Sequence, residues 1–460
     1  MMLSKSLFGT DGFRGEYTEQ TGPGLLNTET ISKLTTALIE FTKEYKILVV
    51  GRDTRPSSNA LAQAVIQAGA TAGVEVWDLG VMPTPGTFKV ARHFKTLAVM
   101  ITASHNPYTD NGWKAAIAGD KLTTGQANKV SDIYWDNLQK THKPKSAGQV
   151  IDKHELSGWY INEVVKDIER EFSAQPLAGK VFVVDGANGA TMNYTPVILE
   201  QLGAKVYRFA CDGVGKINQD CGAANLNGVK DYLKSHSEIT SDPNFIGAIA
   251  CDGDGDRMMG IGILGNNNFV EINGNHVFLA LAKGQPGIVG TLYTNSGLVE
   301  ALNQMGVEFE QCANGDTAVT AALVARQARG DNWTRGGEFT GHHVDTAWLS
   351  SGDGVRMAAW FASYVSRQGK TFADIHKELP LWPEAKTTVI INPNAPKIEE
   401  NATIQQQIKS VKDSLGDKGR IVVRTSGTEP VVRIWGEAKP GTAKIQEIIK
   451  DLSKFIQTNS

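Results

Sequence analysis

Three times along this chain, a run of β-branched residues is followed by an amphipathic helical stretch and a second apolar run. The first copy is KILVVGRDTR (46–55), then NALAQAVIQAGATAG and VEVWDLG. The second is KVFVVDGANGA (180–190) with TPVILEQLGAKVYRF, and the third is PGIVGTLYTNSG (286–297) with LVEALNQMGVEFEQC. A glycine follows each helical stretch, as a C-cap does. The pattern predicts strand, loop, helix and strand in each copy, and hence parallel sheets with right-handed crossovers.

The last hundred residues break this pattern. A polar helix is expected near 398–415, after WPEAKTTVIINPNAP, and it is followed by the strand GRIVVR, a loop, the strand VVRIWGEA and the helix TAKIQEIIKDLSKFIQ. This order favours a small α+β domain. The predicted fold class is therefore α/β, with three topologically similar α/β domains in series and a smaller C-terminal α+β domain. Proline and glycine clusters near 146, 286 and 381–396 are candidate breaks, and the expected domains are 1–150, 151–262, 263–370 and 371–460.

Composition narrows the range of partners. Of the 460 residues, 41% are hydrophobic and 21% charged, as in soluble globular proteins, and the formal net charge is −3. That charge gives no electrostatic reason to expect nucleic acid or an anionic membrane as a partner. The four cysteines form no Cys-x-x-Cys pair, and MMLSKSLFGTDGFRG lacks the apolar run of a signal peptide. We therefore expect a cytoplasmic protein without a membrane span.

The stretch CDGDGDRMMG (251–260) follows the apolar run FIGAIA and is a candidate metal site. Asp252, Asp254 and Asp256 alternate with small residues, so three carboxylates can converge on one cation. Carboxylate oxygens suit magnesium or calcium. An EF-hand is excluded because its twelfth loop position, where a bidentate Glu is needed, is Ile263. The alternative is a solvated Asp-Gly turn. Magnesium with few protein ligands points to phosphoryl chemistry.

Two further loops combine groups that suit a sugar phosphate. In RTSGTEP (424–430), a guanidinium, two hydroxyls and open backbone amides could hold a phosphate, although a plain hairpin turn has the same composition. The residues concerned are Arg424, Ser426, Gly427 and Thr428. In GGEFTGHHV (336–344), Glu338, Thr340 and His342 would face one side of an extended segment and suit sugar hydroxyls and proton transfer. An ordinary polar surface loop is the alternative.

The stretch TASHNP (102–107) ends the apolar run TLAVMI. Ser104 beside His105 could indicate a hydrolase, but the Gly-x-Ser-x-Gly frame of a nucleophile elbow is missing. With a magnesium loop and a phosphate cradle available, Ser104 is better interpreted as a carrier of a phosphoryl group. Lys114 in DNGWK could then steady the developing charge or move a proton.

Together, TASHNP, DGDGDR, GGEFTGH and RTSGTEP, in this order and at these separations, resemble the α-D-phosphohexomutase family. The similarity includes FGTDGFRG (8–15) and covers essentially the whole chain. It implies four domains, three of them alike, around a central cleft. It also implies interconversion of hexose 6-phosphate and hexose 1-phosphate through a phosphoserine enzyme and a sugar 1,6-bisphosphate, which also serves as activator.

The resemblance assigns roles to the residues of these motifs. Ser104 would be the phosphoserine, and one Mg²⁺ would be bound by Asp252, Asp254 and Asp256 with a phosphate oxygen of Ser104. Lys114 and His342 would be the acid/base pair, while Arg257 would contact the phosphorylated intermediate. Arg14 and His105 would support the phosphoserine region. The implied substrate-binding residues are Glu338 and Thr340 for sugar hydroxyls, and Arg424, Ser426, Gly427 and Thr428 for the non-reacting phosphate.

Within the family, FGTDGFRG, DGANGAT, GTLYTNSGLVEAL and TASHNPYTDNG are most similar to enzymes that act on glucosamine phosphates. Those enzymes typically have Gln or Asn at Phe339, Ser at Thr340 and Arg at Thr317. The leading expectation is interconversion of glucosamine 6-phosphate and glucosamine 1-phosphate, with glucose or mannose phosphates as the alternative.

Two other classes of function remain open from the sequence. A magnesium-dependent serine phosphomonoesterase would pass the phosphoryl group to water, and a non-catalytic protein would only bind sugar phosphates. In every case the expected partner is a small phosphosugar, and the chain is expected to be a monomer or a homodimer.

Overall fold

The structure, a computed structural model, describes residues 6–9, 11–138, 147–213, 215–265, 268–392, 397–425, 430–442 and 444–459. The chain forms two compact units. The first consists of Met1–Tyr293 and Met305–Glu378, and the second of Thr294–Gln304 and Leu379–Ser460. The four predicted domain limits stay predictions, because this division separates only the C-terminal part from the rest. None of the described helices combines the length and apolar character that a membrane crossing requires.

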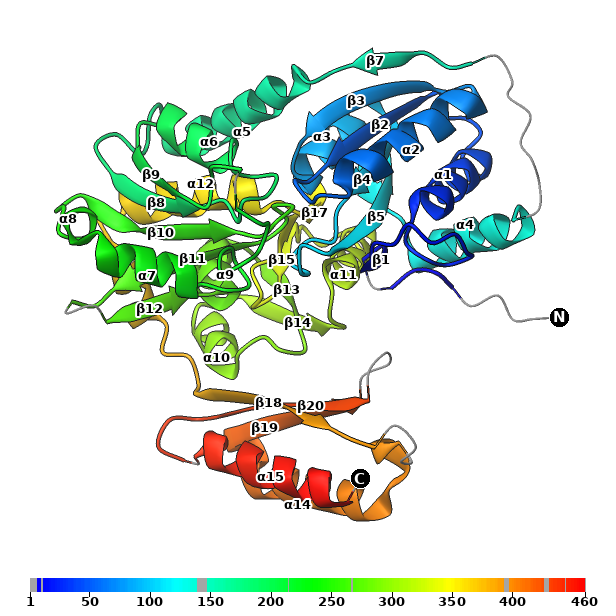
Figure 1. Cartoon of the computed structure of the whole chain (residues 1–460). Helices are drawn as coiled ribbons and strands as arrows, with labels where there is room; N and C mark the ends of the chain where they lie inside the picture. Colours follow the sequence, from blue (N-terminus) through cyan, green and yellow to red (C-terminus); the bar gives the residue numbers. More distant parts are fainter. Residues whose placement is uncertain are drawn as a thin grey trace. The chain divides into compact units, whose positions relative to one another are not determined.

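The first sheet has the strand order β1-β5-β4-β2-β3-β7 (Figure 1), and β6 pairs with β5. Strands β4, β2, β3 and β7 are parallel, whereas β5 is antiparallel to β4, β1 and β6. Its strands are β1 (Phe13–Glu16), β2 (Ile47–Arg52), β3 (Glu75–Val81), β4 (Leu97–Ile101), β5 (Asp110–Ile117), β6 (Asp120–Lys121) and β7 (Val150–Asp152). Its helices are α1 (Thr28–Phe41), α2 (Ser58–Ala72), α3 (Thr84–Phe94) and α4 (Thr124–Asp136).

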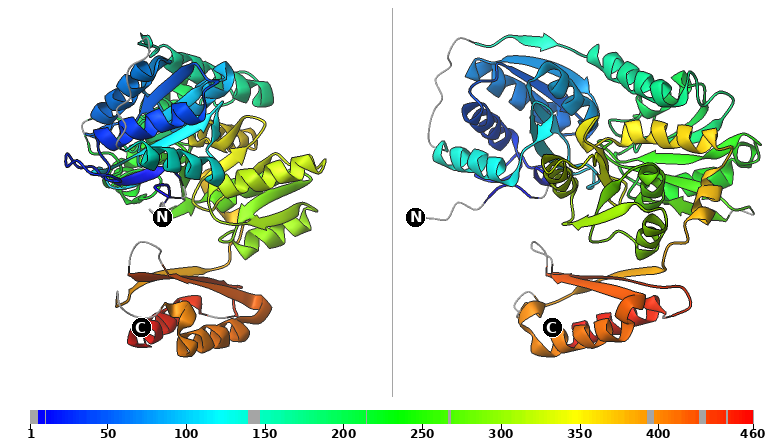
Figure 2. Two further views of the ribbon diagram at one scale, coloured as in Figure 1. Left: turned by 90° about the vertical axis from the view of Figure 1, so that its right-hand side faces the viewer. Right: turned by 180° about the vertical axis from the view of Figure 1, so that it is seen from behind.

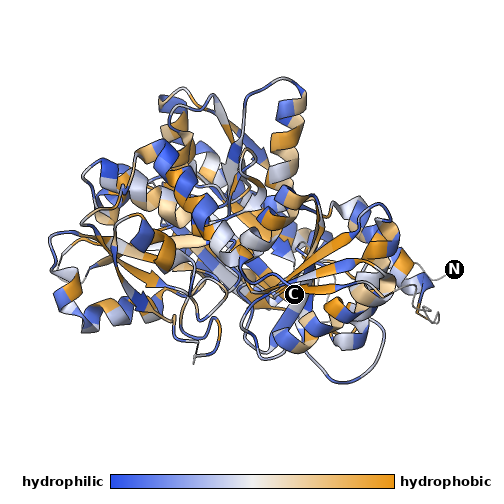
Figure 3. Cartoon of the chain, turned by 90° about the horizontal axis from the view of Figure 1, so that it is seen from above, coloured by the Kyte–Doolittle hydropathy of each residue, from blue (hydrophilic) through white to orange (hydrophobic). Residues whose placement is uncertain are grey.

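Apolar side chains point to both faces of this sheet, and helices cover both faces. Val50 and Val99 share a buried cluster with Leu34 of α1 and Val65 of α2. Met100, the neighbour of Val99, faces the other way and meets α3, which packs on β2 and β4. Figure 3 shows the strands as largely hydrophobic segments among helices with polar outer faces. Gly73 closes α2 with φ +82°, a left-handed conformation that glycine adopts readily, so the predicted C-cap is confirmed.

The second sheet has the order β12-β11-β10-β8-β9, in which β9, β8 and β10 are parallel and β11 and β12 antiparallel. Its strands are β8 (Val181–Asp185), β9 (Lys205–Phe209), β10 (Phe245–Cys251), β11 (Met258–Ile263) and β12 (Phe269–Ile272). Residues of α7 (Asn227–Ser235) and α8 (Ser237–Thr240) share one apolar cluster with its strands. Helices α5 (Leu156–Phe172), α6 (Thr195–Gln201), α12 (Gly354–Arg367) and α13 (Phe372–Glu378) also pack in this region.

The third sheet has the order β14-β13-β15-β16-β17, with β14, β13 and β15 parallel and β16 and β17 antiparallel. Its strands are β13 (Gly287–Thr291), β14 (Glu308–Cys312), β15 (Arg335–Gly337), β16 (His343–Asp345) and β17 (Leu349–Gly352). Helices α9 (Gly274–Ala282) and α11 (Asp316–Ala328) pack against it. The helix of the third predicted copy, α10 (Ser296–Gln304), belongs instead to the second unit, where Ser296 Oγ donates to Glu437 Oε1 at 2.5 Å.

The second unit contains the antiparallel sheet β18-β20-β19, which confirms the predicted α+β character of the C-terminal part. Its elements are β18 (Glu384–Ile390), η1 (Ile398–Glu400), α14 (Ala402–Leu415), η2 (Gly416–Lys418), β19 (Gly419–Thr425), β20 (Val431–Ala438) and α15 (Ile445–Asn459). Helices α14 and α15 lie on one face of the sheet (Figure 1, Figure 2), where isoleucines 404, 408, 449 and 456 form a separate apolar core.

The three sheets of the first unit repeat one arrangement, as the sequence predicts, but the prediction of parallel sheets is incomplete. In each sheet, an outer strand of the parallel group connects to an antiparallel neighbour: β4 to β5, β10 to β11, and β15 to β16. The loops that make these connections are residues 102–109, 252–257 and 338–342. They contain TASHNP, DGDGDR and EFTGH, so all three candidate loops of the first unit occupy equivalent topological positions.

A buried polar junction joins elements of these repeats at Asp353. The Asp353 carboxylate accepts hydrogen bonds from Tyr160 Oη, Trp348 Nε1 and the backbone N–H of Arg356, each at 2.8 Å. Lys89 of α3 donates to the Trp348 carbonyl oxygen at 3.0 Å, and its Nζ lies 3.3 Å from the centre of the Trp348 ring. The Asp353 carboxylate is thus the shared acceptor for α5, α12 and the β16–β17 loop. Asp353 is only 4% exposed, so water cannot easily replace it as acceptor.

Asp353→Ala should lower the free energy of unfolding by about 3 kcal/mol, because it leaves three buried donors without an acceptor. Tyr160→Phe should cost only about 1 kcal/mol, since it removes a single hydrogen bond. Urea unfolding measures both, with Asp231→Ala as the control at an exposed ion pair with Lys234. Equal midpoints for Asp353→Ala and the control would contradict this role of Asp353.

Candidate functional site

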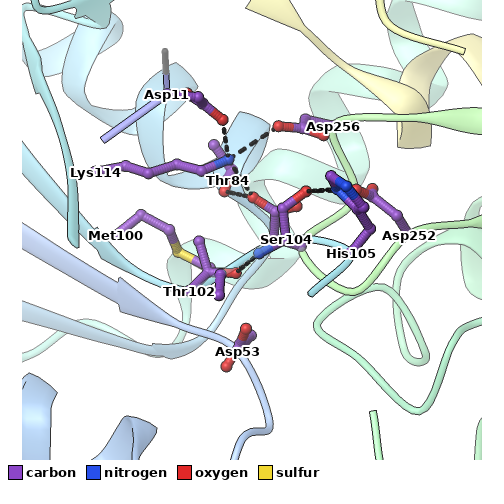
Figure 4. Close-up of polar contacts among 12 residues, drawn as sticks. Asp11, Asp53, Thr84, Met100, Thr102, Ser104, His105, Lys114, Asp252 and Asp256 are labelled. Atoms are coloured by element: carbon purple, nitrogen blue, oxygen red, sulfur yellow. Dashed lines mark hydrogen bonds and ion pairs between the residues drawn. The ribbon is translucent and has the colours of Figure 1, made fainter. Parts of the chain in front are cut away.

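The three equivalent loops of the first unit meet at one place. Ser104 Oγ, from the loop after β4, donates to Asp252 Oδ2, from the loop after β10, at 2.7 Å (Figure 4). The second and third loops are joined by an isolated β-bridge between Arg257 and His342, and the Met258 N–H donates to the Gly341 carbonyl oxygen. The structure therefore brings the candidate nucleophile, the three aspartates and the candidate sugar loop together.

Ser104 is fully buried, and its backbone is left-handed with φ +54°. Its N–H donates to Thr102 Oγ1 at 2.9 Å, while His105 Nδ1 lies 3.4 Å from its Oγ. Burial, with Arg257 and Arg14 nearby, lowers the pKa of His105 to about 3. The imidazole beside Ser104 is therefore neutral at physiological pH.

Asp252, Asp254 and Asp256 are all 0% exposed, and one oxygen from each lies within 4.8 Å of the others. Burial and the two neighbouring carboxylates raise the pKa of Asp252 to about 7. Thr84 Oγ1 donates to Asp254 Oδ2 at 2.5 Å, but Asp254 Oδ1 is buried without a hydrogen-bond partner among the described residues. An oxygen-rich buried cluster with an unsatisfied carboxylate oxygen fits a hard divalent cation.

Lys114 of β5 supplies positive charge to this cluster. Its Nζ donates to Asp254 Oδ2 at 2.7 Å and Asp256 Oδ2 at 3.0 Å, and it lies 2.9 Å from Asp11 Oδ2. Burial lowers the pKa of Lys114, but these three carboxylates outweigh burial and hold it well above its usual value. Lys114 is therefore an ammonium ion, able to donate a proton and to stabilise negative charge.

His342 is enclosed by two carboxylates. Its Nδ1 lies 2.8 Å from Glu338 Oε2 and its Nε2 lies 2.9 Å from Asp256 Oδ1, with Arg257 Nε at 3.2 Å. Although burial acts against the charged form, Asp256 and Glu338 raise the pKa of His342 to about 10. Burial raises the pKa of Glu338, but the bond from His342 and one from the Gly315 N–H (3.0 Å) leave it lowered. The pair is thus an imidazolium and a carboxylate.

The remaining predicted residues differ in how closely they join this cluster. Arg14 of β1 is bonded to Asp11 and donates to the Ala103 carbonyl oxygen at 3.5 Å, next to Ser104. Thr340 is half-buried in the turn between β15 and β16. Arg424 is exposed on β19 of the second unit. Ser426, Gly427 and Thr428 lie outside the described residues, so the predicted phosphate cradle stays a prediction.

Some residues of the cluster were missed by sequence reasoning. Asp11 bridges Lys114, Arg14 and Lys121, and Lys121 Nζ donates onward to Asp316 Oδ2 at 2.6 Å. Asp11 lies within FGTDGFRG, so the motif carried a signal that was not assigned to a residue. Thr84 and Asn218 have no local signal, because their contacts with the site join segments more than a hundred residues apart.

Comparison with known proteins identifies the family of this chain. Family models described as phosphoglucomutase/phosphomannomutase match residues 5–141 (alpha/beta/alpha domain I), 272–381 (alpha/beta/alpha domain III) and 390–454 (C-terminal domain). The phosphoglucosamine mutase of Hydrogenovibrio crunogenus is 30% identical and aligns over 100% of this chain and 99% of its own length. That of Thermus thermophilus is 32% identical, with 98% of both chains covered.

Solved structures show the same fold. A phosphoglucomutase/phosphomannomutase family protein of Burkholderia thailandensis has a TM-score of 0.78 at 20% identity, covering 100% of this chain and 99% of that one. N-acetylphosphoglucosamine mutase of Aspergillus fumigatus, in complex with GlcNAc-6P and magnesium, has a TM-score of 0.61 at 16% identity, covering 98% and 94%. Because full-length relatives reach 30% identity and all three family models match in order, this chain belongs to the α-D-phosphohexomutases, the phosphosugar mutases of the isomerase class.

Proposed function

We propose that this enzyme interconverts glucosamine 6-phosphate and glucosamine 1-phosphate, with Ser104 as the phosphoryl carrier and one Mg²⁺ as cofactor. The observation that carries the proposal is the 2.7 Å hydrogen bond from Ser104 Oγ to Asp252 Oδ2. It places this buried serine in direct contact with one of the candidate metal ligands. The relatives named phosphoglucosamine mutase support the choice of sugar. The magnesium complex of the Aspergillus protein supports the choice of metal.

The proposed residues can complete two balanced phosphoryl transfers. In the first, a sugar hydroxyl oxygen forms a bond to the phosphorus on Ser104 while the bond to Ser104 Oγ breaks. Lys114 gives its proton to the departing Oγ. The imidazolium of His342 restores the proton of Lys114 and takes up the hydroxyl proton in its place, so that both groups end in the form in which they began. The second transfer runs the same changes in reverse, from the other phosphate of the sugar 1,6-bisphosphate to Ser104. That bisphosphate would also serve as the activator that phosphorylates the free serine.

Bound Mg²⁺ would neutralise charge on the transferring phosphoryl group, and Asp252, Asp254 and Asp256 would hold it with a phosphate oxygen of Ser104. Glu338 and Thr340 would bind sugar hydroxyls. Arg257, beside both His342 and Asp252, would contact the phosphorylated intermediate. Arg424, Ser426, Gly427 and Thr428 would hold the non-reacting phosphate.

One observation favours a second candidate substrate. The Phe339 ring packs edge-on against Tyr293, with ring centres 5.9 Å apart. An aromatic ring at this position offers no amide to a substituent on the sugar, so a glucose or mannose phosphate is the alternative substrate of the same mechanism.

Phosphorus NMR with Mg²⁺ and trace sugar 1,6-bisphosphate decides between these substrates. We expect glucosamine 1-phosphate to be converted to the 6-phosphate faster than glucose or mannose 1-phosphate, each offered separately. Faster conversion of glucose or mannose 1-phosphate would contradict the choice of sugar. Release of inorganic phosphate without any 6-phosphate would instead support a phosphomonoesterase.

Ser104→Ala should reduce turnover by at least about 1,000-fold, because the phosphoryl carrier is lost. Binding of the sugar monophosphate, followed by calorimetry, should persist. Ser235→Ala, an exposed serine at the end of α7, is the matched control and should retain full turnover. Substantial activity in the Ser104→Ala enzyme would rule out the phosphoserine mechanism and leave another carrier to be found.

Asp254→Asn should weaken Mg²⁺ binding at least about tenfold, because a neutral amide replaces one of the charged ligands. Titration calorimetry with MgCl₂ measures the affinity, and Asp231→Asn provides an exposed control. Chelation by EDTA should abolish turnover of the unaltered enzyme and added Mg²⁺ should restore it. An Asp254→Asn affinity equal to that of the control would place the metal elsewhere.

A further inference from the structure

The backbone of Ser104 is held in a conformation that serine rarely adopts. Its φ of +54° lies in the left-handed region, where the Cβ of an L residue is crowded. The backbone fixes Cβ, and the hydrogen bond from Oγ to Asp252 holds the rotation about the Cα–Cβ bond. Whatever holds the peptide groups of Ser104 therefore fixes the point from which the reacting oxygen is presented.

Two side chains donate hydrogen bonds to the Ser104 carbonyl oxygen. Arg55 Nη2 lies at 2.8 Å and Asn218 Nδ2 at 2.7 Å. Both also donate to the carbonyl oxygen of Asn106, at 2.9 Å and 3.2 Å. Together with the bond from the Ser104 N–H to Thr102 Oγ1, these contacts fix the peptide groups on both sides of the serine.

The two donors come from different sheets. Arg55 follows β2 of the first sheet, the sheet that also carries the Ser104 loop, and its side chain is fully buried against Asp53. Asn218 lies between β9 and α7 of the second sheet, and its own N–H donates to the Ala187 carbonyl oxygen at 3.0 Å. Asn218 therefore ties the Ser104 backbone to the sheet that carries the metal loop.

The metal loop packs closely against the hydrogen bond between Asn218 and Ser104. A Cβ built on Gly253, inside the metal loop, would lie 2.8 Å from the Ser104 carbonyl oxygen and 2.9 Å from Asn218 Nδ2. A second contact comes from the same segment, since Lys216 Nζ donates to Tyr108 Oη at 3.0 Å and lies 4.1 Å from the ring centre. The 215–220 segment thus contacts the Ser104 loop at two points.

We propose that Asn218 is a positioning residue, which fixes the Ser104 backbone relative to the metal loop and so aligns the phosphoryl group for transfer to the sugar. The inference rests on the proposed function, because it assigns Asn218 a part in that reaction. Asn218 does not contact Ser104 Oγ, so its effect passes through the Ser104 carbonyl. A displacement of about 1 Å at a reacting centre can slow a reaction about 100-fold, which sets the scale of the expected effect.

Asn218→Gly tests this role without straining the backbone. Asn218 has φ +60°, a conformation that glycine adopts freely, so the substitution removes the amide and keeps the local fold. We expect kcat to fall at least about tenfold while KM changes by less than about twofold. We also expect a larger share of the phosphoryl groups to be lost to water, because water accepts them with less demanding alignment. Asn218→Asp, similar in shape but without donors, should show the same loss.

Asp220→Gly is the matched control, because Asp220 lies two residues further along with φ +55°. Within the described part of the chain, the Asp220 side chain has no hydrogen bond with the Ser104 loop. This variant should keep kcat within about twofold of the unaltered enzyme. Hydrogen exchange of the 103–110 segment provides a readout independent of turnover, and it should quicken in Asn218→Gly but not in Asp220→Gly.

Unchanged kcat and unchanged exchange in Asn218→Gly would overturn the proposal, as would equal losses in both glycine variants. A rise in KM with kcat preserved in Asn218→Gly would show a role in substrate binding and would also overturn the proposal. If the unaltered enzyme isomerises none of the three sugars, the proposed function fails, whereas the exchange comparison still decides whether Asn218 fixes the Ser104 loop.

Discussion

Three carboxylates on one six-residue loop, all removed from solvent, are the constraint that organises the first unit. Burying like charges together is costly unless each is matched by positive charge and hydrogen bonds. The metal loop itself supplies few of these partners. Lys114 comes from β5 of the first sheet, His342 from the loop between β15 and β16 of the third sheet, and Thr84 from the start of α3. The loop therefore reaches a low-energy arrangement only when all three sheets are in place around it.

The repeated sheet arrangement explains how these partners arrive at one point. Each site loop leaves the carboxyl end of a parallel strand and turns into an antiparallel neighbour. The three loops occupy the same position in three sheets, yet their side chains differ: a serine, three aspartates, and a carboxylate–imidazole pair. One topological solution thus provides a nucleophile, a cation site and a sugar-binding candidate, and the differences between them lie in a few side chains at each turn.

Much of this could be predicted because the information is local. The strand, helix and glycine cap of the first copy follow from hydrophobic periodicity, and α2 with Gly73 forms as that pattern indicates. The alternating aspartates also show their chemistry within one short stretch. The antiparallel neighbours were not predicted, because β5, β11 and β16 owe their direction to pairing with another strand rather than to their own pattern.

Contacts between distant segments explain the other misses. Helix α10 follows β13 directly, as the third copy predicts, but its first turn is bound by Glu437, which lies more than 130 residues further along. Asn218 sits in the polar stretch GKINQD, whose composition indicates only a turn, and its contact with Ser104 spans 114 residues. Such roles depend on which chain segments the fold places together, and a single sequence does not show this.

The charge balance of the site gives a physical reason why metal and phosphate belong together in the proposed mechanism. Even with Lys114 and His342 charged, burial and the neighbouring carboxylates keep the pKa of Asp252 raised, and Asp254 keeps an unsatisfied oxygen. A phosphoryl group on Ser104 would add a charge of about −1.5 to −2 beside Asp252. A divalent cation adds nearly the opposite charge at the same place. Phosphorylation of Ser104 should therefore be tolerated in this buried position only together with cation binding, and each should strengthen the other.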